Sequence, residues 1–596
     1  MLLIASVVVA HPLRIAHHGC VVPRNLQRHG EGMRPFRRRH HPSSPFTIEG
    51  DQQQGCLGYR GLGLDESLDP APSSSELSEV RRDGVVNPAT LRGMPTALLN
   101  PARRPPEPTH APIMAATFHN RGRSRAEKMT PMAASFDLVV LGAGSGGYAC
   151  ALRAAELGLT VGLAEKDKVG GTCLHRGCIP TKAMLHAAEV ADSVRLGSQF
   201  GIHAAIDKID LAGVVSYADS VVDRIYKGLS GLVSSRGITI IHGAGRLRLQ
   251  NGRPALAVDD ETYEAANLVL ATGSYSRSLP GLDVDGVKIL TSEHALRLDR
   301  LPASAIVLGG GVVGVEFASA WRSFGVEITV VEALPRLVSG EDQSVSTALE
   351  RAFSKRKINV ITNAAMSACQ PTESGVRLEL ANGQPLEAEI MLVAVGRGPQ
   401  TADLGYQEAG VDLEDGFVRV TERLETSVPG AYALGDVVRG LQLAHRGFAQ
   451  GIFVAEEIAH RKSILHQAPV PIVDADVPRI TYCDPEIASV GLTEEQARSR
   501  FGDVETLTYD LTGNGKSQIL KTRGFIKLVR RPNGPVVGVH MIGARVSELA
   551  GEAQLITNWE AFPSDVAGLI HAHPTQSEAL SEAHLALAGK PLHTHG

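Results

Sequence analysis

One pattern occurs twice in this chain and constrains its fold more than any other feature: a short apolar strand that runs into a glycine-rich turn and then a helix. The glycines of the two turns are Gly142, Gly144 and Gly147 after residues 136–141, and Gly309, Gly311 and Gly314 after residues 305–308. Such glycines permit a tight turn and a close approach of the backbone to a pyrophosphate, which the N-terminus of the following helix attracts. The repeat therefore predicts an α/β chain with two Rossmann-like dinucleotide-binding domains.

A glutamate ends the strand that follows each turn, at the same spacing from the first glycine. These residues are Glu165 in the first unit and Glu332 in the second. A carboxylate in this position accepts hydrogen bonds from ribose hydroxyls and repels the 2′-phosphate of NADP. We therefore expect the second unit to bind NAD in preference to NADP.

The net charge of −5 is unevenly distributed along the chain. Residues 1–130 carry 16 Arg and one Lys against 11 acidic residues, so the remainder is acidic. An acidic body disfavours a nucleic-acid partner, because phosphate binding requires a basic surface.

No apolar run approaches the ~20 residues of a membrane helix, so no membrane partner is expected. Seven cysteines are too few for a disulfide framework, which favours a reducing, cytoplasmic location.

Residues 1–132 do not resemble a folded domain, because no amphipathic period persists there. Three interpretations remain open: a disordered tail, a targeting peptide, or sequence translated upstream of a true start at Met129 or Met132. A secretory signal would need a positive segment before its apolar stretch, and a transit peptide would lack the acidic residues found at 65–83. We expect a disordered or spurious extension that contributes no chemistry.

A pair of cysteines follows the first unit, in the segment Gly-Gly-Thr-Cys-Leu-His-Arg-Gly-Cys-Ile-Pro-Thr-Lys at residues 170–182. Cys173 and Cys178 stand at the start of a predicted helix and can form a disulfide only where that helix is distorted, which Gly177 makes easy. The helix N-terminus and nearby cations would lower a thiol pKa and favour the thiolate. A redox pair, a structural disulfide and two core thiols remain the alternatives. A metal site is not expected, because no second Cys/His pair stands at ligand spacing.

The segment His-Ala-His-Pro-Thr-Gln-Ser-Glu at residues 571–578 is a further candidate site. It is either a polar surface turn or an acid–base pair. Dithiol chemistry requires a group that moves a proton near pH 7, which suits histidine, and a nearby carboxylate can orient the imidazole.

Residues 170–182 resemble the active-site segment of the flavoprotein pyridine nucleotide-disulfide oxidoreductases, and the Ile-Pro-Thr-Lys ending is most similar to the members that oxidise dihydrolipoamide. The likeness runs from about residue 136 to residue 596. It implies an FAD-binding domain at 133–280, an NAD-binding domain at 281–402, a central domain at 403–473 that returns to the FAD fold, and an α+β dimerisation domain at 474–596. One departure is His175-Arg176, where many relatives have Asn and a small apolar residue; this version resembles actinobacterial members.

The resemblance assigns roles to the cysteine segment. Cys178 would face the flavin, and Cys173 would exchange with the substrate disulfide. Lys182 would lie near flavin N5 and pair with Glu316, which follows the second glycine turn.

The resemblance also assigns His573 as the acid–base group and Glu578 as its partner, with His571 uninvolved. In this family the pair acts on the cysteines of the other subunit, which implies a homodimer. Further cofactor contacts are implied at Gly171, Thr172, Gly245, Thr272, Gly273, Ser274, Asp436 and Ala444 for FAD, and at Gly396 for NAD.

The implied reaction is the oxidation of protein-bound dihydrolipoamide by NAD⁺ through a redox disulfide and FAD. The implied partners are the lipoyl domains of 2-oxo-acid dehydrogenase complexes or the glycine-cleavage carrier protein. Two alternatives keep the scaffold: a glutathione-reductase-like enzyme would need a cationic NADP pocket, and a mercuric-reductase-like enzyme would need a cysteine pair after Cys483. A third alternative is a mainly structural flavin-binding component of such a complex.

Deleting residues 1–130 should leave flavin content, thermal unfolding and lipoamide turnover unchanged, because that stretch shows no pattern able to bury a core. The comparison is between the truncated and full-length proteins, both purified in the presence of FAD. A truncated protein that loses flavin or activity would show that the extension contributes to the folded enzyme.

Overall fold

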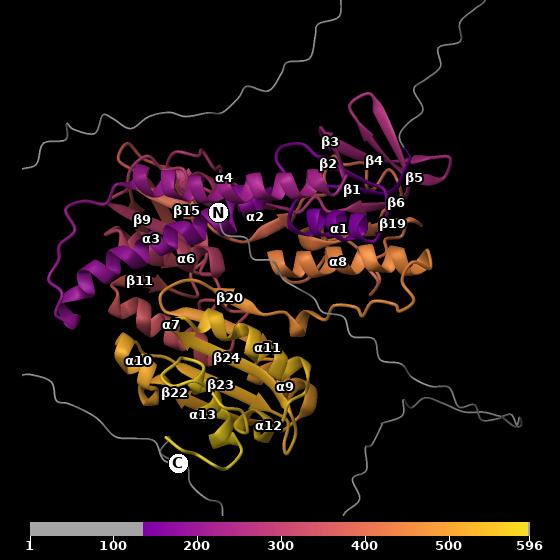
Figure 1. Ribbon diagram of the computed structural model, residues 1–596. Helices are drawn as coiled ribbons and strands as arrows, with labels where there is room; N and C mark the ends of the chain where they lie inside the picture. The colour runs from indigo at the N-terminus through magenta and orange to yellow at the C-terminus, as the bar shows by residue number, and fades with distance from the viewer. Residues whose placement is uncertain (1–134, 594–596) are drawn as a thin grey trace, which may run out of the picture. The chain divides into compact units, whose positions relative to one another are not determined.

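The computed structural model describes residues 135–593 (Figure 1). The extension expected at residues 1–132 and the last three residues lie outside this range. The described part is a mixed α/β structure built on three large sheets, as the sequence predicted. None of its helices is long and apolar enough to cross a membrane.

The first sheet contains the first glycine turn. Its strands are β1 (Ser135–Leu141), β2 (Val161–Glu165), β3 (Thr239–His242), β4 (Gly245–Gln250), β5 (Arg253–Val258), β6 (Glu261–Leu270) and β19 (Ala431–Ala433), in the order β3-β2-β1-β6-β5-β4 with β19 beside β6. β1 is buried along most of its length, as a parallel strand covered on both faces must be. Because β2 and β6 flank β1 in parallel, the turn after β1 opens at the switch point where such sheets bind ligands.

Two helices that are distant in sequence pack together beside this sheet. α1 (Ser145–Glu156) follows the first glycine turn, and α8 (Ala444–Arg461) lies next to it (Figure 1). Glycines allow this close approach, since a Cβ on Gly451 would lie 2.2 Å from the Gly146 carbonyl oxygen. The packing brings the segment after β19 back to the first turn.

The second sheet repeats this design around the second glycine turn. It is parallel throughout, in the order β11 (Ile358–Ile361), β10 (Glu327–Val331), β9 (Ser304–Leu308), β15 (Ile390–Val393) and β8 (Ile289–Leu290). Helix α6 (Val312–Ser323) follows β9, and α7 (Gln343–Lys355) precedes β11. A small antiparallel sheet is formed by β12 (Met366–Pro371), β13 (Val376–Leu380) and β14 (Pro385–Ala388).

A two-stranded ribbon joins the two dinucleotide folds. β7 (Ser274–Ser276) leaves the first fold, and β16 (Arg397–Pro399) leaves the second; they pair antiparallel. The short elements around the folds are α5 (Ser292–Ala295), β17 (Leu413–Glu414), β18 (Phe417–Val418) and the 3₁₀ turns η1 (Gly197–Phe200), η2 (Gly435–Val437), η3 (Asp474–Asp476), η4 (Leu511–Gly513) and η5 (Val546–Leu549).

The C-terminal part is an antiparallel sheet with helices packed against it. Its strands run in the order β20 (Arg479–Thr481), β21 (Glu486–Gly491), β24 (Val536–Gly543), β23 (Phe525–Arg530) and β22 (Glu505–Asp510). The helices are α9 (Glu494–Phe501), α10 (Gly515–Leu520), α11 (Ala550–Asn558), α12 (Pro563–Ala567) and α13 (Glu578–Leu587).

Three helices between β2 and β3 contain the cysteine segment and connect it to the rest of the protein. They are α2 (Gly171–Arg176), α3 (Cys178–Leu196) and α4 (Leu211–Ser235). Met184 and Ala188 of α3 share one hydrophobic core with Val307 of the second sheet and Ile487 of the C-terminal sheet. This common core fixes α3, and with it Cys178, relative to both sheets.

Candidate functional site

Both glycine turns have the geometry of a phosphate cradle. Gly142 and Gly309 adopt positive φ angles of +101° and +111°. In each turn the third glycine is packed against the first: a Cβ on Gly147 would lie 1.9 Å from the Gly142 carbonyl oxygen, and one on Gly314 would lie 1.9 Å from that of Gly309.

The central glycines of the two turns, in contrast, have open space beside them. A Cβ on Gly144 or Gly311 would meet no atom within 4 Å. Each turn thus closes tightly against its helix and leaves room in front of the helix N-terminus for a ligand's phosphates. The two turns therefore fit a dinucleotide each.

Glu165 and Glu332 each accept a hydrogen bond from the backbone of the glycine turn in their own fold. The Ala143 N–H donates to one carboxylate oxygen of Glu165 at 2.8 Å, and the Gly310 N–H donates to Glu332 at 2.6 Å. The other oxygen of Glu332 accepts from the Leu334 N–H at 2.7 Å. A carboxylate oxygen has a second lone-pair direction, so each glutamate can still accept from a ribose hydroxyl.

A chain of polar contacts joins the ribbon between the two folds to η2. The Ser274 hydroxyl donates to Asp436 at 2.6 Å and accepts from Arg397 Nε at 2.7 Å. The Thr272 hydroxyl donates to the Gln400 carbonyl oxygen at 2.7 Å. The structure thus brings Ser274 and Asp436, which are 162 residues apart, to one place.

The remaining residues expected to contact cofactors fall into two groups. Gly273 and Gly396 adopt positive φ and have open space beside them, and Ala444 begins α8. Gly171 and Gly245 are tightly packed: a Cβ on Gly171 would lie 2.6 Å from Gly144 Cα, and one on Gly245 would lie 2.6 Å from the Leu141 side chain. Thr172 follows Gly171 in α2, directly before Cys173.

The helix expected over the cysteine segment is broken in two. Cys173 lies in α2 and Cys178 begins α3, with Gly177 between them at φ −141° and ψ −108°. Both cysteines are free thiols, and each is the largest influence on the pKa of the other. The break therefore supplies the distortion that the sequence required of a redox pair.

The two thiols have different acidities. The Cys173 thiol donates to the Cys178 sulfur, and this bond, aided by the Lys182 ammonium and opposed by burial, lowers the pKa of Cys178 to about 7. The same hydrogen bond raises the pKa of Cys173, and burial raises it further. In the reduced pair, Cys178 is therefore the thiolate and Cys173 the thiol.

Lys182 is held in place by a buried carboxylate. Its Nζ donates to both oxygens of Glu316, at 2.9 and 3.0 Å, and lies 4.8 Å from the ring centre of Tyr482. Burial disfavours the Lys182 ammonium, but Glu316 outweighs this effect, so the pKa of Lys182 is raised. The Tyr482 N–H donates to Glu316 at 3.0 Å.

Sequence reasoning did not identify Tyr482 as part of this site. Its contribution comes from a backbone N–H that the fold brings to Glu316 and a ring that it brings to Lys182. The sequence placed Tyr482 only within the dimerisation domain expected at 474–596.

The C-terminal pair is present as a hydrogen-bonded unit. His573 Nδ1 lies 2.8 Å from one carboxylate oxygen of Glu578, and the Thr575 N–H donates to the other at 2.8 Å. Burial favours the neutral acid, but these two donors prevail, so the pKa of Glu578 is lowered. The His573 side chain is 77% exposed, so its Nε2 is available to an incoming group.

His571, expected to be uninvolved, has a separate partner. Its Nε2 lies 2.7 Å from Glu552 of α11. Within residues 135–593, no hydrogen bond or ion pair joins His573 or Glu578 to Cys173 or Cys178. The two halves of the expected catalytic site lie in separate parts of the fold (Figure 1).

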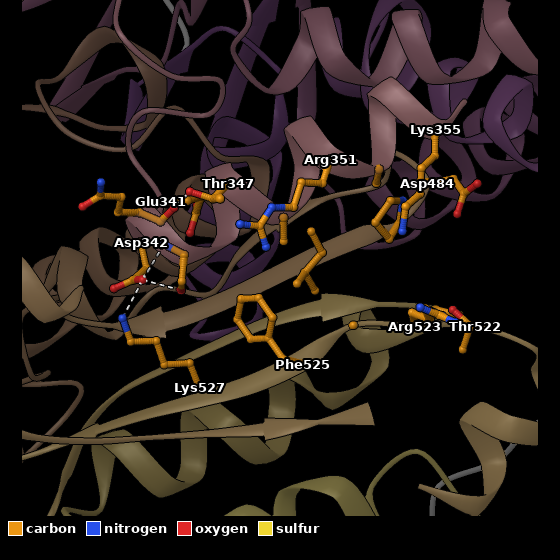
Figure 2. Close-up of a pocket in the computed structure, with 18 of the residues that line it drawn as sticks. Glu341, Asp342, Thr347, Arg351, Lys355, Asp484, Thr522, Arg523, Phe525 and Lys527 are labelled. Carbon is orange, nitrogen blue, oxygen red and sulfur yellow. Dashed lines mark hydrogen bonds and ion pairs between the residues drawn. The ribbon is translucent and has the colours of Figure 1, made fainter. Parts of the chain in front are cut away.

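A cavity of about 1270 Å³ lies elsewhere, between α7 and the C-terminal sheet (Figure 2). Asp342 and Lys527 form an ion pair at 2.8 Å at one end, and Arg351 and Lys355 reach into it from α7. None of the residues expected to bind cofactors or to react lines this cavity. The candidate site is therefore defined by side-chain chemistry rather than by cavity size.

Comparison with protein families decides the class of this site. A family profile described as pyridine nucleotide-disulphide oxidoreductase matches residues 136–451, and the profile of its dimerisation domain matches residues 477–584. The chain belongs to the pyridine nucleotide-disulphide oxidoreductase family. This family uses FAD and NAD, and the two glycine turns offer one cradle for each.

Individual relatives agree with this assignment. The dihydrolipoyl dehydrogenase of Bacillus subtilis (strain 168) is 37% identical over 482 residues, which cover 78% of this chain and all of that protein. The dihydrolipoyl dehydrogenase of Chlorobaculum parvum is 39% identical and covers 76% of this chain and 96% of its own length. Among solved structures, LpdA from Mycobacterium tuberculosis superposes with a TM-score of 0.70 at 28% identity, covering 76% of this chain and 99% of its own.

In the reduced protein, Cys178 should react with iodoacetamide with a pH midpoint near 7, because alkylation requires the thiolate. Cys173→Ala removes the thiol that donates to Cys178 and should move the midpoint up towards the ordinary thiol value of about 8.5. The measurement is the alkylation rate of the Cys178 peptide by mass spectrometry between pH 5 and 10. An unchanged midpoint in the variant would refute the proposed hydrogen bond.

Proposed function

We propose that this family member is a dihydrolipoyl dehydrogenase, which oxidises protein-bound dihydrolipoamide to lipoamide with NAD⁺ through the Cys173–Cys178 disulfide and FAD. The observation that supports this most directly is the pair itself: two free thiols at the break between α2 and α3, with a lowered pKa at Cys178 and a lysine four residues on that a buried carboxylate holds in place. The curated relatives that bear this name match almost their whole length.

The chemistry of the thiols follows from their unequal acidities. A thiolate of dihydrolipoamide attacks Cys173 Sγ of the disulfide, and Cys178 leaves as a thiolate, which its low pKa and Lys182 favour. The second substrate thiol then attacks the mixed disulfide, so that lipoamide departs and Cys173 is released as a thiol. FAD, held at the first glycine turn, would supply the route by which the electron pair of the dithiol reaches NAD⁺ at the second.

Protons must leave the substrate thiols during these steps, and His573 is the proposed acceptor. Glu578 accepts from His573 Nδ1–H, which leaves Nε2 as the basic nitrogen and stabilises the imidazolium after protonation. Because His573 and the cysteines lie in separate parts of the fold, we assign the working site to two subunits of a homodimer. The presence of the family's dimerisation domain supports this assignment.

The same proposal assigns cofactor preference and partners. Glu332, with its carboxylate against the Gly310 N–H, would repel a 2′-phosphate, so NAD is preferred to NADP. Its partners would be the lipoyl domains of 2-oxo-acid dehydrogenase complexes or the glycine-cleavage carrier protein, which present dihydrolipoamide.

A paired assay tests the proposed reaction. The purified, FAD-loaded protein should oxidise NADH with lipoamide as acceptor, and it should do so much faster than with glutathione disulfide. NADPH should be a poor substitute for NADH. Turnover of glutathione disulfide that equals or exceeds that of lipoamide would refute the substrate assignment.

Mixing two inactive variants should restore activity if the site is shared between subunits. Cys173→Ser should abolish lipoamide turnover, and His573→Gln should slow it by roughly 10²–10⁴-fold, the usual contribution of general acid–base catalysis. Under conditions that allow subunit exchange, a mixed dimer has one site with both defects and one with neither. Lipoamide turnover should then return towards half of the parental value per mixed dimer.

The control for this experiment is each variant incubated alone under the same exchange conditions. If both halves of the site came from one chain, every site in the mixture would keep a defect. No recovery of activity in verified mixed dimers would contradict the shared site.

A further inference from the structure

The helix that contains Cys173 cannot hold its position by itself. α2 has six residues, too few to be stable through its own hydrogen bonds. Its N-cap, Gly170, is left-handed and supplies no side-chain cap, and Gly177 separates it from α3. α3, in contrast, has 19 residues and is anchored in the core shared by the sheets. The position of Cys173 relative to Cys178 therefore depends on the tertiary contacts of α2.

Two polar side chains of α2 provide such contacts, in addition to the buried Leu174. His175 Nε2–H donates to the carbonyl oxygen of Val169 at 2.9 Å, since a carbonyl can only accept. The imidazole also meets the ring of Tyr226 in α4 in an edge-to-face arrangement, with 5.3 Å between ring centres. Arg176 donates to Asp167 at 2.9 Å. Within residues 135–593, no other side-chain nitrogen or oxygen of α2 forms a hydrogen bond.

Both partners of these bonds lie in the segment 166–170, which follows Glu165. The Asp167 N–H donates to one oxygen of Glu165 at 3.0 Å, while the other oxygen accepts from the Ala143 N–H. The Gly170 N–H donates to the Ala143 carbonyl oxygen at 2.8 Å. A continuous set of hydrogen bonds thus runs from α2 through the segment 166–170 to the first glycine turn.

We propose that His175 and Arg176 are positioning residues that fasten α2 to the segment 166–170 and thereby hold Cys173 in contact with Cys178 beside the first glycine turn. They act through the backbone of α2, because their own hydrogen bonds go to Val169 and Asp167 rather than to a sulfur. The proposal rests on the proposed function only in taking the two cysteines as the redox pair.

Loosening α2 should make the Cys173–Cys178 disulfide harder to reduce. The charged and titratable groups that act on Cys178 are Cys173, Lys182 and Glu316. Lys182 and Glu316 are fixed on α3 and α6, so movement of α2 acts mainly through the contact from Cys173, which is the largest influence on the pKa of Cys178 and outweighs the opposing effect of burial. The reduced form then loses a hydrogen bond to its thiolate, and a disulfide whose reduced form is less stable is harder to reduce.

The test compares His175→Ala with the parental flavin-loaded enzyme. We expect the pH midpoint of Cys178 alkylation to rise by roughly one unit. We also expect the equilibrium constant for reducing the disulfide with dithiothreitol to fall about tenfold, which corresponds to ~30 mV. Thiols trapped with maleimide and quantified by mass spectrometry on the Cys173 and Cys178 peptides give this constant without any lipoamide.

Two matched variants separate positioning from general destabilisation. His175→Gln keeps an N–H that can reach the Val169 carbonyl oxygen, and it should restore most of both values. His186→Ala removes an exposed histidine of α3 that pairs with Glu189, and it should change neither value. Should His175→Ala fail to accumulate as folded protein, Arg176→Gln, at an exposed position, is measured in the same way.

The outcomes are distinct. pH midpoints within about 0.3 units of the parental value, together with equilibrium constants within twofold of it, in both His175→Ala and Arg176→Gln would overturn the proposal. So would a shift in His175→Ala that His186→Ala reproduces. A failed lipoamide assay would instead refute the proposed substrate and leave these thiol measurements interpretable, because they need no lipoamide.

Discussion

The buried carboxylate of Glu316 is the constraint on which the site depends. It lies on α6 of the second dinucleotide fold, pairs with Lys182 of α3 and accepts from the backbone of Tyr482 at the start of the C-terminal sheet. Its side chain is 3% exposed, so removing one partner would leave an uncompensated buried charge at a cost of about 3–5 kcal/mol. Glu316 therefore links the second fold and the C-terminal sheet to the helix that begins with Cys178, in addition to the hydrophobic core that they share.

The two cysteines of the redox pair are held with different rigidity. Cys178 begins a long helix with a fixed cation four residues away, whereas Cys173 belongs to a single short helix held by side-chain contacts to its neighbours. The asymmetry matches the chemistry proposed for the two sulfurs. The leaving thiolate needs a stable electrostatic environment, and the sulfur that exchanges with substrate must be reached by an external thiol.

The two dinucleotide folds show how much of the architecture follows from local sequence. The expected strands 136–141 and 305–308 begin one residue earlier in the structure, at Ser135 and Ser304, and both end at the residue expected. These elements were predictable because buried parallel strands are apolar throughout and glycine marks their turns. The two dinucleotide folds differ in what packs against their glycine turns. The cysteine segment packs against the first turn, where Gly171 contacts Gly144.

The sequence by itself determined the local features: the paired dinucleotide folds, the distortion at Gly177 and the contact between His573 and Glu578, which are five residues apart. Only the tertiary structure decided which distant groups meet. Lys182 and Glu316, which only the family resemblance paired in advance, are 134 residues apart, Ser274 and Asp436 are 162 apart, and His571 lies against Glu552 on another helix. The physical reason is that spacing along a helix or turn specifies neighbours within a few residues, whereas long-range partners are chosen by how the buried faces of sheets and helices pack.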